Sequence, residues 1–298
     1  MLLGGDREAW RGASLLSISQ LDREGVELVM RVADNARTES SLLGGKVLCS
    51  LFYEPSTRTA CSFLAAMLRL GGGTMSLHES TSSAVKGESF EDTIRTVSCY
   101  SDVVVLRHPT PGAPRRASEI TKTPIINAGD GTGEHPTQAL LDVYTLIREI
   151  GGIDGKTIAL VGDLKHGRTA HSLAKILRLY DVALLFVSPP GLEMPGTQEV
   201  VSLEEAVRVA DAIYVTRIQR ERFEDPGQYD SLKGSYKVDA ALMATAKPKC
   251  AVLHPLPRVD EISTDFDDDP RAAYFRQMEN GMYVRMALLT LILSPPSK

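Results

Sequence analysis

The chain has 298 residues, of which 43% are hydrophobic and 24% are charged, and its formal net charge is -5. A chain of this length has enough apolar material for a packed core and favours two domains over one. The acidic balance gives no broad basic surface for a phosphate backbone, so we do not expect nucleic acid as a partner. Any anion site must then be a local cluster of Arg and Lys.

The four cysteines are scattered, with no C-x-x-C pair and no histidine at zinc-ligand spacing. This pattern disfavours a disulfide framework and a structural metal site, and it fits a reducing cytosol. Charges at residues 6–8 stand where a signal peptide would be apolar, and the run from Met286 to Leu293 is too short to span a bilayer. We therefore expect a cytoplasmic protein without a membrane partner; the start at Met1 leaves open whether the chain is a complete protein or a segment.

Short apolar runs rich in β-branched residues alternate with segments of helical periodicity. This alternation is typical of buried parallel strands joined by crossover helices, so the sequence predicts an α/β protein. The predicted strands are Val103–Leu106, Ile158–Val161, Ala183–Val187, Ala212–Val215 and Ala251–Leu253. Helices are predicted after residues 56–59, after Pro136, and from Tyr274 to Leu293.

A glycine-rich stretch at 151–155 ends the second of these helices, and a new strand–loop–helix unit starts at Thr157. We expect two domains, each with a parallel sheet flanked by helices. The first domain comprises residues 1–136 and the second residues 137–275. The C-terminal helix is expected to return to the first domain, so that residues 276–298 pack against it.

Polar residues cluster at the predicted strand ends in the first half of the chain. Residues 56–59, Ser-Thr-Arg-Thr, place hydroxyls and a guanidinium at a helix start, where free amides and the helix dipole favour a phosphate. Arg107 ends a buried strand, and ligands of open α/β sheets bind outside such ends. Taken singly, these residues equally fit an ordinary helix cap and a surface arginine.

Two further segments carry candidate polar groups. A glycine-rich loop delivers His135 and Gln138 to a helix start, where the histidine can donate to a carbonyl oxygen and the glutamine can accept from an amide. Ser82 and Lys86 lie four residues apart in a long polar stretch that begins at His78 and could cover a bound phosphate. A loop histidine with local hydrogen bonds and a solvated loop are the plainer interpretations.

The strand ends of the second half favour a carboxylate over a nucleotide. Residues 162–169 differ by one residue from the P-loop pattern, because Arg168 replaces its lysine, and the G-x-G-x-x-G pattern is absent. A nucleotide hydrolase and a dinucleotide-binding module are therefore disfavoured. Arg168 suits a carboxylate as a bidentate partner. Arg217 and Gln219 follow the next strand two residues apart, with Glu221 placed to orient Arg217, unless the loop is merely charged surface.

The last strand is followed by residues 254–258, His-Pro-Leu-Pro-Arg. Its prolines remove N–H donors and leave carbonyl oxygens for an amide group to bind. A proline-stiffened strand exit without a ligand is the alternative.

Seven segments, taken together and in order, resemble the aspartate carbamoyltransferase family: residues 52–59, 86–88, 106–109, 135–138, 167–169, 216–219 and 254–257. The match spans nearly the whole chain. The tail from Asp269 to Arg285 is most similar to the form of this enzyme carried by the animal multifunctional pyrimidine-synthesis protein, which implies a segment of a larger polypeptide. Between Pro195 and Ser202 the chain is shorter than is usual in the family, so a helix of the second domain is expected to be missing there.

The resemblance implies an active site between two α/β domains, in a homotrimer whose subunits share their sites. It implies that carbamoyl phosphate is bound through its phosphate by Ser56, Thr57, Arg58, Thr59 and Arg107, with Ser82 and Lys86 from the neighbouring subunit. It also implies that the carbamoyl oxygen accepts from Thr59, Arg107 and His135, and that the carbamoyl NH2 is held by Gln138 and the carbonyls of Pro255 and Leu256. The aspartate carboxylates would be bound by Arg168, Arg217 and Gln219, and Lys86 would contact both substrates.

The implied reaction needs no protein nucleophile, metal or organic cofactor. The amine of aspartate attacks the carbamoyl carbon, fixed donors stabilise the oxyanion, and the departing phosphate can take the amine proton. The alternatives are an ornithine-specific relative and an inactive scaffold of the same fold. Arg217 would repel the ornithine side chain, and the ornithine branch carries Cys where this chain has Pro255. An inactive scaffold is disfavoured because the implied catalytic residues are all present, namely Arg58, Arg107, His135 and Lys86.

Overall fold

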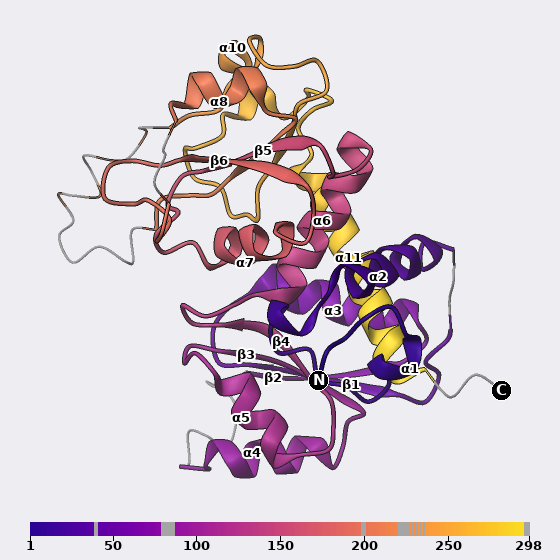
Figure 1. Cartoon of the computed structure of the whole chain (residues 1–298). Helices are drawn as coiled ribbons and strands as arrows, with labels where there is room; N and C mark the ends of the chain where they lie inside the picture. Colours follow the sequence, from indigo (N-terminus) through magenta and orange to yellow (C-terminus); the bar gives the residue numbers. More distant parts are fainter. Residues whose placement is uncertain are drawn as a thin grey trace. The chain divides into compact units, whose positions relative to one another are not determined.

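The computed structural model describes residues 1–38, 41–78, 87–197, 201–219, 227, 229, 232, 234 and 236–294. It contains two compact units, which we call unit 1 (residues 1–141 with 279–298) and unit 2 (residues 142–278). The division passes within two helices, α6 (Pro136–Ile150) and α11 (Tyr274–Leu293) (Figure 1). The boundaries predicted from the sequence, at 136/137 and 275/276, lie a few residues from these divisions.

Unit 1 is built on a four-stranded parallel sheet in the order β2-β1-β3-β4. Its strands are β1 (Val47–Phe52), β2 (Gly73–His78), β3 (Val103–His108) and β4 (Ile125–Asp130). Its other elements are α1 (Arg7–Trp10), η1 (Ile18–Gln20), α2 (Arg23–Asn35), α3 (Thr57–Arg69), α4 (Phe90–Ser98) and α5 (Ala113–Ile120). From β1 the chain adds β2 on one side and β3 on the other, so the loops after β1 and β3 flank the topological switch point, where α/β sheets bind ligands.

Both faces of the unit 1 sheet are buried. Successive side chains of a strand point to opposite faces, and here both alternating sets are apolar. On β3, Val103 and Val105 pack with α3 and α11, whereas Val104 and Leu106 pack with α4 and α5. Figure 1 shows α4 and α5 together on one side of this sheet. The middle of each strand is therefore packed in the core, and polar groups lie at the strand ends.

Unit 2 repeats this plan, with a parallel sheet in the order β6-β5-β7-β8. Its strands are β5 (Lys156–Val161), β6 (Val182–Val187), β7 (Ala212–Val215) and β8 (Ala251–Leu253). Its other elements are α7 (Arg168–Leu177), α8 (Leu203–Val209), α10 (Ala240–Met243) and η5 (Thr264–Phe266). Here the switch point lies between β5 and β7. Of the residues described between β6 and α8, 188–197 form turns without a helix, and 198–200 lie outside the described part.

In each unit an aspartate directly before the third strand bonds to the amino end of the first strand and forms an ion pair with a lysine. In unit 2, Asp211 accepts from the N–H of Thr157 (2.9 Å) and from Nζ of Lys247 (2.9 Å). In unit 1, Asp102 accepts from the N–H of Val47 and from Nζ of Lys46, each at 2.8 Å. These carboxylates fasten the sheet at the edge opposite the loops that carry the predicted site.

Replacing Asp211 by Asn should lower stability without affecting activity. Burial alone would raise the pKa of Asp211, but the hydrogen bonds from Thr157 and Lys247 bring this pKa below its usual value. A depressed folded-state pKa stabilises the protein above the unfolded pKa of ~3.9, and this stabilisation is lost as the pH falls through the folded pKa.

We expect Asp211→Asn to reduce the free energy of unfolding by about 1–2 kcal/mol at pH 7, with a smaller difference near pH 3. Urea unfolding at both pH values measures this, with the exposed Asp268→Asn as the control. Equal losses for the two variants would show that the Asp211 contacts contribute nothing specific.

The α/β fold predicted from the sequence is confirmed. The strands expected at Ala212–Val215 and Ala251–Leu253 and the helix expected from Tyr274 have the observed bounds, and the other predicted strands are extended by one or two residues. Within the described residues no helix is long and apolar enough to cross a membrane.

Candidate active site

The phosphate motif of the sequence lies at the start of α3, directly after the turn that follows β1. Ser56 is the N-cap, but its hydroxyl makes no capping hydrogen bond. Thr57 and Arg58 are exposed in the first turn, and Thr59 is buried. The turn thus presents hydroxyls, amides and a cation at the positive end of a 13-residue helix, which is the arrangement that binds phosphate.

Arg107 reaches the same edge from the end of β3. Its side chain is only 12% exposed, and Nη1 donates to the carbonyl of Ala128 on β4 (3.2 Å). Its Nε lies 3.3 Å from Oε2 of Glu54, which follows β1. The guanidinium is therefore oriented by an ion pair with a residue after β1 and by a hydrogen bond to β4, before any ligand binds.

His108, next in sequence, has a packing environment. Its ring lies 4.8 Å from that of Tyr53 and 5.3 Å from that of Phe90, measured between centroids. Its Nδ1 accepts from the N–H of Thr110 at 3.0 Å. His108 therefore stabilises the loop after β3 through ring packing and a hydrogen bond from Thr110.

His135 and Gln138 stand at the start of α6, beyond the end of β4. Both are almost completely buried, at 4% and 6% exposure. His135 Nδ1 lies 3.5 Å from the hydroxyl of Thr137. Because the two side chains project from one rigid helical turn, their donor and acceptor groups are held in a fixed relation to each other.

The loop that delivers His135 is organised by Asp130, the last residue of β4. One of its carboxylate oxygens accepts from the N–H of Glu134 (2.7 Å), and the other accepts from the N–H of Gly112 (2.8 Å). Gly131 has φ +54°, and a Cβ there would lie 1.9 Å from the carbonyl oxygen of Pro109, so glycine is required. Asp130 therefore links the loop after Arg107 to the loop before His135.

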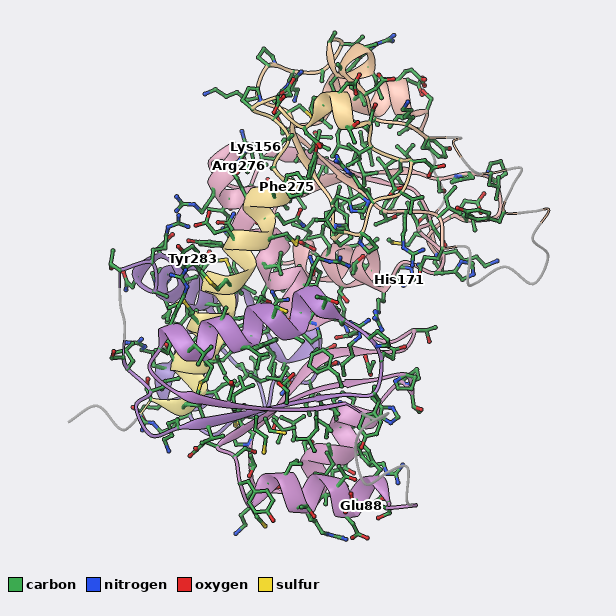
Figure 2. All side chains as sticks on the ribbon, turned by 180° about the vertical axis from the view of Figure 1, so that it is seen from behind. Glu88, Lys156, His171, Phe275, Arg276 and Tyr283 are labelled. Carbon is green, nitrogen blue, oxygen red and sulfur yellow. The ribbon has the colours of Figure 1, made fainter. Side chains whose placement is uncertain are left out.

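In unit 2, Arg168 is the first residue of α7, after the loop that follows β5. The buried Asp163 fastens this loop by accepting from the N–H of His166 (3.0 Å), and it lies 3.1 Å from Nδ1 of the same histidine. His171 of α7, labelled in Figure 2, donates from Nε2 to the carbonyl of Leu164 (2.6 Å). Hydrogen bonds from His166 and His171 thus restrain the loop that precedes Arg168.

Arg217 and Gln219 follow β7, and both are half-buried. The ends of β5 and β7 approach closely because Gly162 adopts φ +114°; a Cβ there would lie 2.0 Å from the carbonyl oxygen of Thr216. The hydroxyl of Thr216 donates to the carbonyl of Val161 (3.1 Å). The loops after β5 and β7 therefore leave the sheet side by side at the switch point of unit 2.

Pro255 and Leu256 follow β8 and are half-buried. Leu256 has φ +55°, and its N–H donates to Nδ1 of His254 at 2.7 Å. Among the described residues, no backbone N–H donates to the carbonyl oxygen of either residue. No backbone hydrogen bond within the described residues therefore prevents a ligand NH2 group from donating to either carbonyl oxygen.

The structure thus brings the predicted residues together in two sets, one in each unit. Unit 1 gathers those after β1, β3 and β4, which are Ser56, Thr57, Arg58, Thr59, Arg107, His135 and Gln138. Unit 2 gathers those after β5, β7 and β8, which are Arg168, Arg217, Gln219, Pro255 and Leu256. Ser82, Lys86 and Glu221 lie outside the described residues.

Sequence reasoning missed the carboxylates that organise these loops, namely Glu54, Asp130 and Asp163. A signal was present for two of them, because Gly129-Asp130 and Gly162-Asp163 are both Gly-Asp pairs at a strand end. Such a pair supplies a positive-φ turn and a short carboxylate that accepts amides from the next loop. Glu54 carried no comparable signal, since its contact with Arg107 exists only once β1 pairs with β3.

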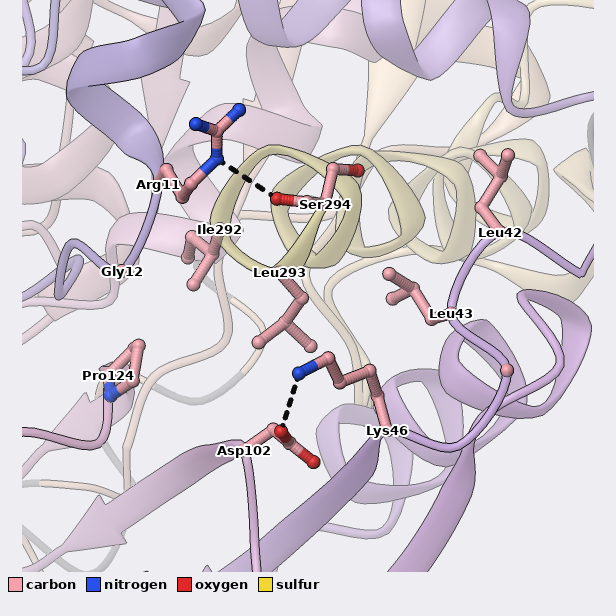
Figure 3. A pocket seen from close by; sticks show the side chains of 11 residues that line it. Arg11, Gly12, Leu42, Leu43, Lys46, Asp102, Pro124, Ile292, Leu293 and Ser294 are labelled. Carbon is pink, nitrogen blue, oxygen red and sulfur yellow. Dashed lines mark hydrogen bonds and ion pairs between the residues drawn. The ribbon is translucent and has the colours of Figure 1, made fainter. Parts of the chain in front are cut away.

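A pocket of about 520 Å³ in unit 1 lies elsewhere (Figure 3). It is lined at the amino ends of the strands by Lys46, Asp102 and Pro124, together with Leu293 near the end of α11. None of the predicted site residues lines it. Within the described ranges, no cluster of three His, Cys, Asp or Glu side chains is placed to hold a metal ion.

The four cysteines are not among the candidate site residues. All four cysteines are free. Burial raises the pKa of Cys49 and of Cys250 to about 12, so both remain protonated at neutral pH and are not nucleophiles.

Two parallel sheets flanked by helices, each with arginines at the carboxyl ends of its strands, are typical of α/β proteins that bind anionic small molecules. Two family models match the chain: "Aspartate/ornithine carbamoyltransferase, carbamoyl-P binding domain" over residues 13–148 and "Aspartate/ornithine carbamoyltransferase, Asp/Orn binding domain" over residues 154–292. The chain belongs to the aspartate/ornithine carbamoyltransferase family, and the resemblance inferred from its motifs is confirmed.

Individual relatives agree with this membership. The aspartate carbamoyltransferase catalytic subunit of Thermococcus gammatolerans is 49% identical over 303 residues, which cover 95% of this chain and 98% of that protein. The multifunctional protein CAD of Squalus acanthias is 50% identical over 95% of this chain, but the match spans only 13% of CAD. Aspartate transcarbamoylase of Trypanosoma cruzi, solved with N-(phosphonacetyl)-L-aspartic acid, superposes with a TM-score of 0.91 at 43% identity, covering 96% of this chain and 97% of the other.

Proposed function

We propose that this chain is an aspartate carbamoyltransferase, which transfers the carbamoyl group of carbamoyl phosphate to L-aspartate and yields N-carbamoyl-L-aspartate and phosphate. The observation that supports the proposal is the placement of the strand-end residues, with a helix start suited to phosphate in unit 1 and arginines suited to carboxylates in unit 2. The family models describe the same division. By this reaction the chain contributes to pyrimidine biosynthesis, as the multifunctional relative suggests.

In the proposed site, unit 1 binds carbamoyl phosphate. Ser56, Thr57, Arg58 and Thr59 bind the phosphate at the start of α3, together with Arg107. Thr59, Arg107 and His135 donate to the carbamoyl oxygen. Gln138 accepts from the carbamoyl NH2, and the carbonyls of Pro255 and Leu256 in unit 2 accept from it as well.

Unit 2 binds aspartate through Arg168, Arg217 and Gln219. A guanidinium binds a carboxylate by two parallel hydrogen bonds, and two arginines match the two carboxylates of aspartate. The same cations would repel the ammonium of ornithine. This charge pattern favours aspartate over the other substrate class of the family.

The reaction then proceeds by attack of the neutral amine on the carbamoyl carbon. Negative charge develops on the carbamoyl oxygen, for which Thr59, Arg107 and His135 are the proposed donors, and loss of one such donor typically costs about 10²- to 10³-fold in rate. The C–O bond to phosphate breaks as the tetrahedral intermediate collapses, and the phosphate takes the amine proton. Arg107 is suited to this task because Glu54 and Ala128 fix it in advance.

We further propose a cytoplasmic homotrimer in which Ser82 and Lys86 complete the site of the neighbouring subunit. The family resemblance supports the trimer, and four free thiols suit a reducing compartment. A solution mass three times the 32.4 kDa of one chain is the expected result. The 95% coverage of this chain by a small part of CAD also supports a place within a larger multifunctional polypeptide.

Binding of N-(phosphonacetyl)-L-aspartate tests the substrate pair directly, because this compound joins a phosphonate to aspartate. Linking two ligands that occupy adjacent sites strengthens binding by about 10²- to 10⁴-fold. We therefore expect calorimetry to show binding at least about 100-fold tighter than that of phosphonoacetate. The ornithine analogue is the matched control, and tighter binding of that analogue would contradict the assignment to aspartate.

A further inference from the structure

His254, the first residue after β8, and Glu261 form a buried pair within unit 2. Their side chains are 1% and 7% exposed, and His254 Nε2 lies 2.7 Å from Oε1 of Glu261. The pair encloses the turn 255–257, which carries two proposed acceptors for the carbamoyl NH2. Neither His254 nor Glu261 has a direct role in the proposed reaction.

The hydrogen bonds of His254 define what its ring does. Nδ1 accepts from the N–H of Leu256 (2.7 Å), so the ring proton is on Nε2 and is donated to Glu261. The other carboxylate oxygen of Glu261 accepts from the N–H groups of Val259 and Asp260, both at 3.1 Å. The Glu261 carboxylate thereby orients the His254 ring through one oxygen and binds the backbone at Val259 and Asp260 through the other.

The carboxylate of Glu261 is held in its ionised form. Burial alone would raise its pKa, but the hydrogen bond from His254 and those from the backbone N–H groups bring the pKa below its usual value. The pair therefore has one stable arrangement at neutral pH, with a carboxylate as the acceptor and Nε2 as the donor.

The backbone on the other side of His254 is also tied. Its N–H donates to Oε1 of Gln277 (2.9 Å), and Nε2 of Gln277 donates to Oδ1 of Asp142 (2.6 Å). Gln277 and Asp142 are both completely buried. His254 is thus fixed at its ring and its main chain.

This restraint acts on an unfavourable backbone conformation. Leu256 has φ +55°, in the left-handed region that is unfavourable for a non-glycine residue. The bond from its N–H to the His254 ring offsets this cost. Without it, the turn would relax toward negative φ and carry the adjacent carbonyl groups with it.

We propose that His254, oriented by Glu261, is a positioning residue that sets the Pro255 and Leu256 carbonyls to recognise the NH2 group of the carbamoyl donor. The inference rests on the proposed function. Its chemical consequence is selectivity: the pair matters for a donor with an NH2 group and not for acetyl phosphate, which has a methyl group in that place.

The test compares His254→Leu, which removes both ring hydrogen bonds, with His254→Asn, whose side-chain oxygen can still accept from the N–H of Leu256. For His254→Leu we expect kcat/KM for carbamoyl phosphate to fall by about 100-fold, since small displacements of positioning groups cost this much. His254→Asn should recover about tenfold of this loss. The inhibition constant of acetyl phosphate should change less than about twofold in either variant.

Arg271→Leu controls for general destabilisation of unit 2, because Arg271 pairs with Asp269 (2.7 Å) and lies outside the proposed site. Assays run well below the melting temperature of every variant, and Glu261→Gln replaces His254→Leu if the latter does not fold. A wild-type chain that forms no carbamoyl aspartate would overturn the proposed function itself. With an active wild type, equal losses for carbamoyl phosphate and acetyl phosphate, or no recovery in His254→Asn, would overturn the positioning role.

Discussion

Arg58→Ala should reduce carbamoyl aspartate formation by about 10³-fold or more, the largest effect expected for any single substitution in unit 1. Arg58 is exposed in the first turn of α3, where it supplies the cation of the proposed phosphate-binding turn. Its loss removes a charge-assisted hydrogen bond to a group that becomes more negative as the C–O bond breaks. Both binding and the chemical step should suffer, so kcat should fall as well as the affinity for carbamoyl phosphate.

The matched control for this prediction is Arg31→Ala, since Arg31 is an exposed arginine on α2 of the same unit. Initial rates at saturating aspartate, with carbamoyl phosphate varied, give both constants for each variant. Near-normal rates in Arg58→Ala would remove the phosphate site from the start of α3.

Arg217→Ala should chiefly raise the KM for aspartate, by about 100-fold, which corresponds to roughly 3 kcal/mol. Arg217 follows β7 at the switch point of unit 2, and its proposed partner is a carboxylate of aspartate that does not change charge during the reaction. An interaction made equally in the ground and transition states affects KM more than kcat. The affinity for carbamoyl phosphate should stay within about threefold of the original value.

Arg208→Ala is the control for this variant, because Arg208 is exposed on α8 in the same unit. Steady-state rates with aspartate varied at saturating carbamoyl phosphate separate KM from kcat. A fall in kcat with an unchanged KM would place Arg217 at the reacting atoms and away from the aspartate carboxylates.

The sequence predicted those elements whose periodicity is unambiguous. Val103–Leu106 and Ala212–Val215 are apolar β-branched runs that suit only a buried strand, and both are strands. β1, β2 and β4 were not predicted, because Val47–Phe52 contains Ser and Cys, Gly73–His78 contains Gly and several polar residues, and Ile125–Asp130 ends in small and polar residues. They form strands because β1 and β4 pair with β3 and β2 pairs with β1, which is a tertiary effect that local preference does not contain.

The candidate site could be predicted as far as the residues that follow each strand. Arg107 and Arg217 were found because the ends of parallel strands share one edge of a sheet. The groups that hold them could not be found in this way. Glu54 meets Arg107 across the β1–β3 pairing, and Glu261 meets His254 across the six residues 255–260, whose geometry no periodicity encodes.

The most direct test of the central claim is transfer of a ¹³C-labelled carbamoyl group, followed by NMR with aspartate and ornithine compared side by side in the presence of EDTA. We expect label in carbamoyl aspartate alone, at a rate that the chelator does not change. Label in citrulline, or no transfer to either amine by a folded chain that still binds carbamoyl phosphate, would contradict the account.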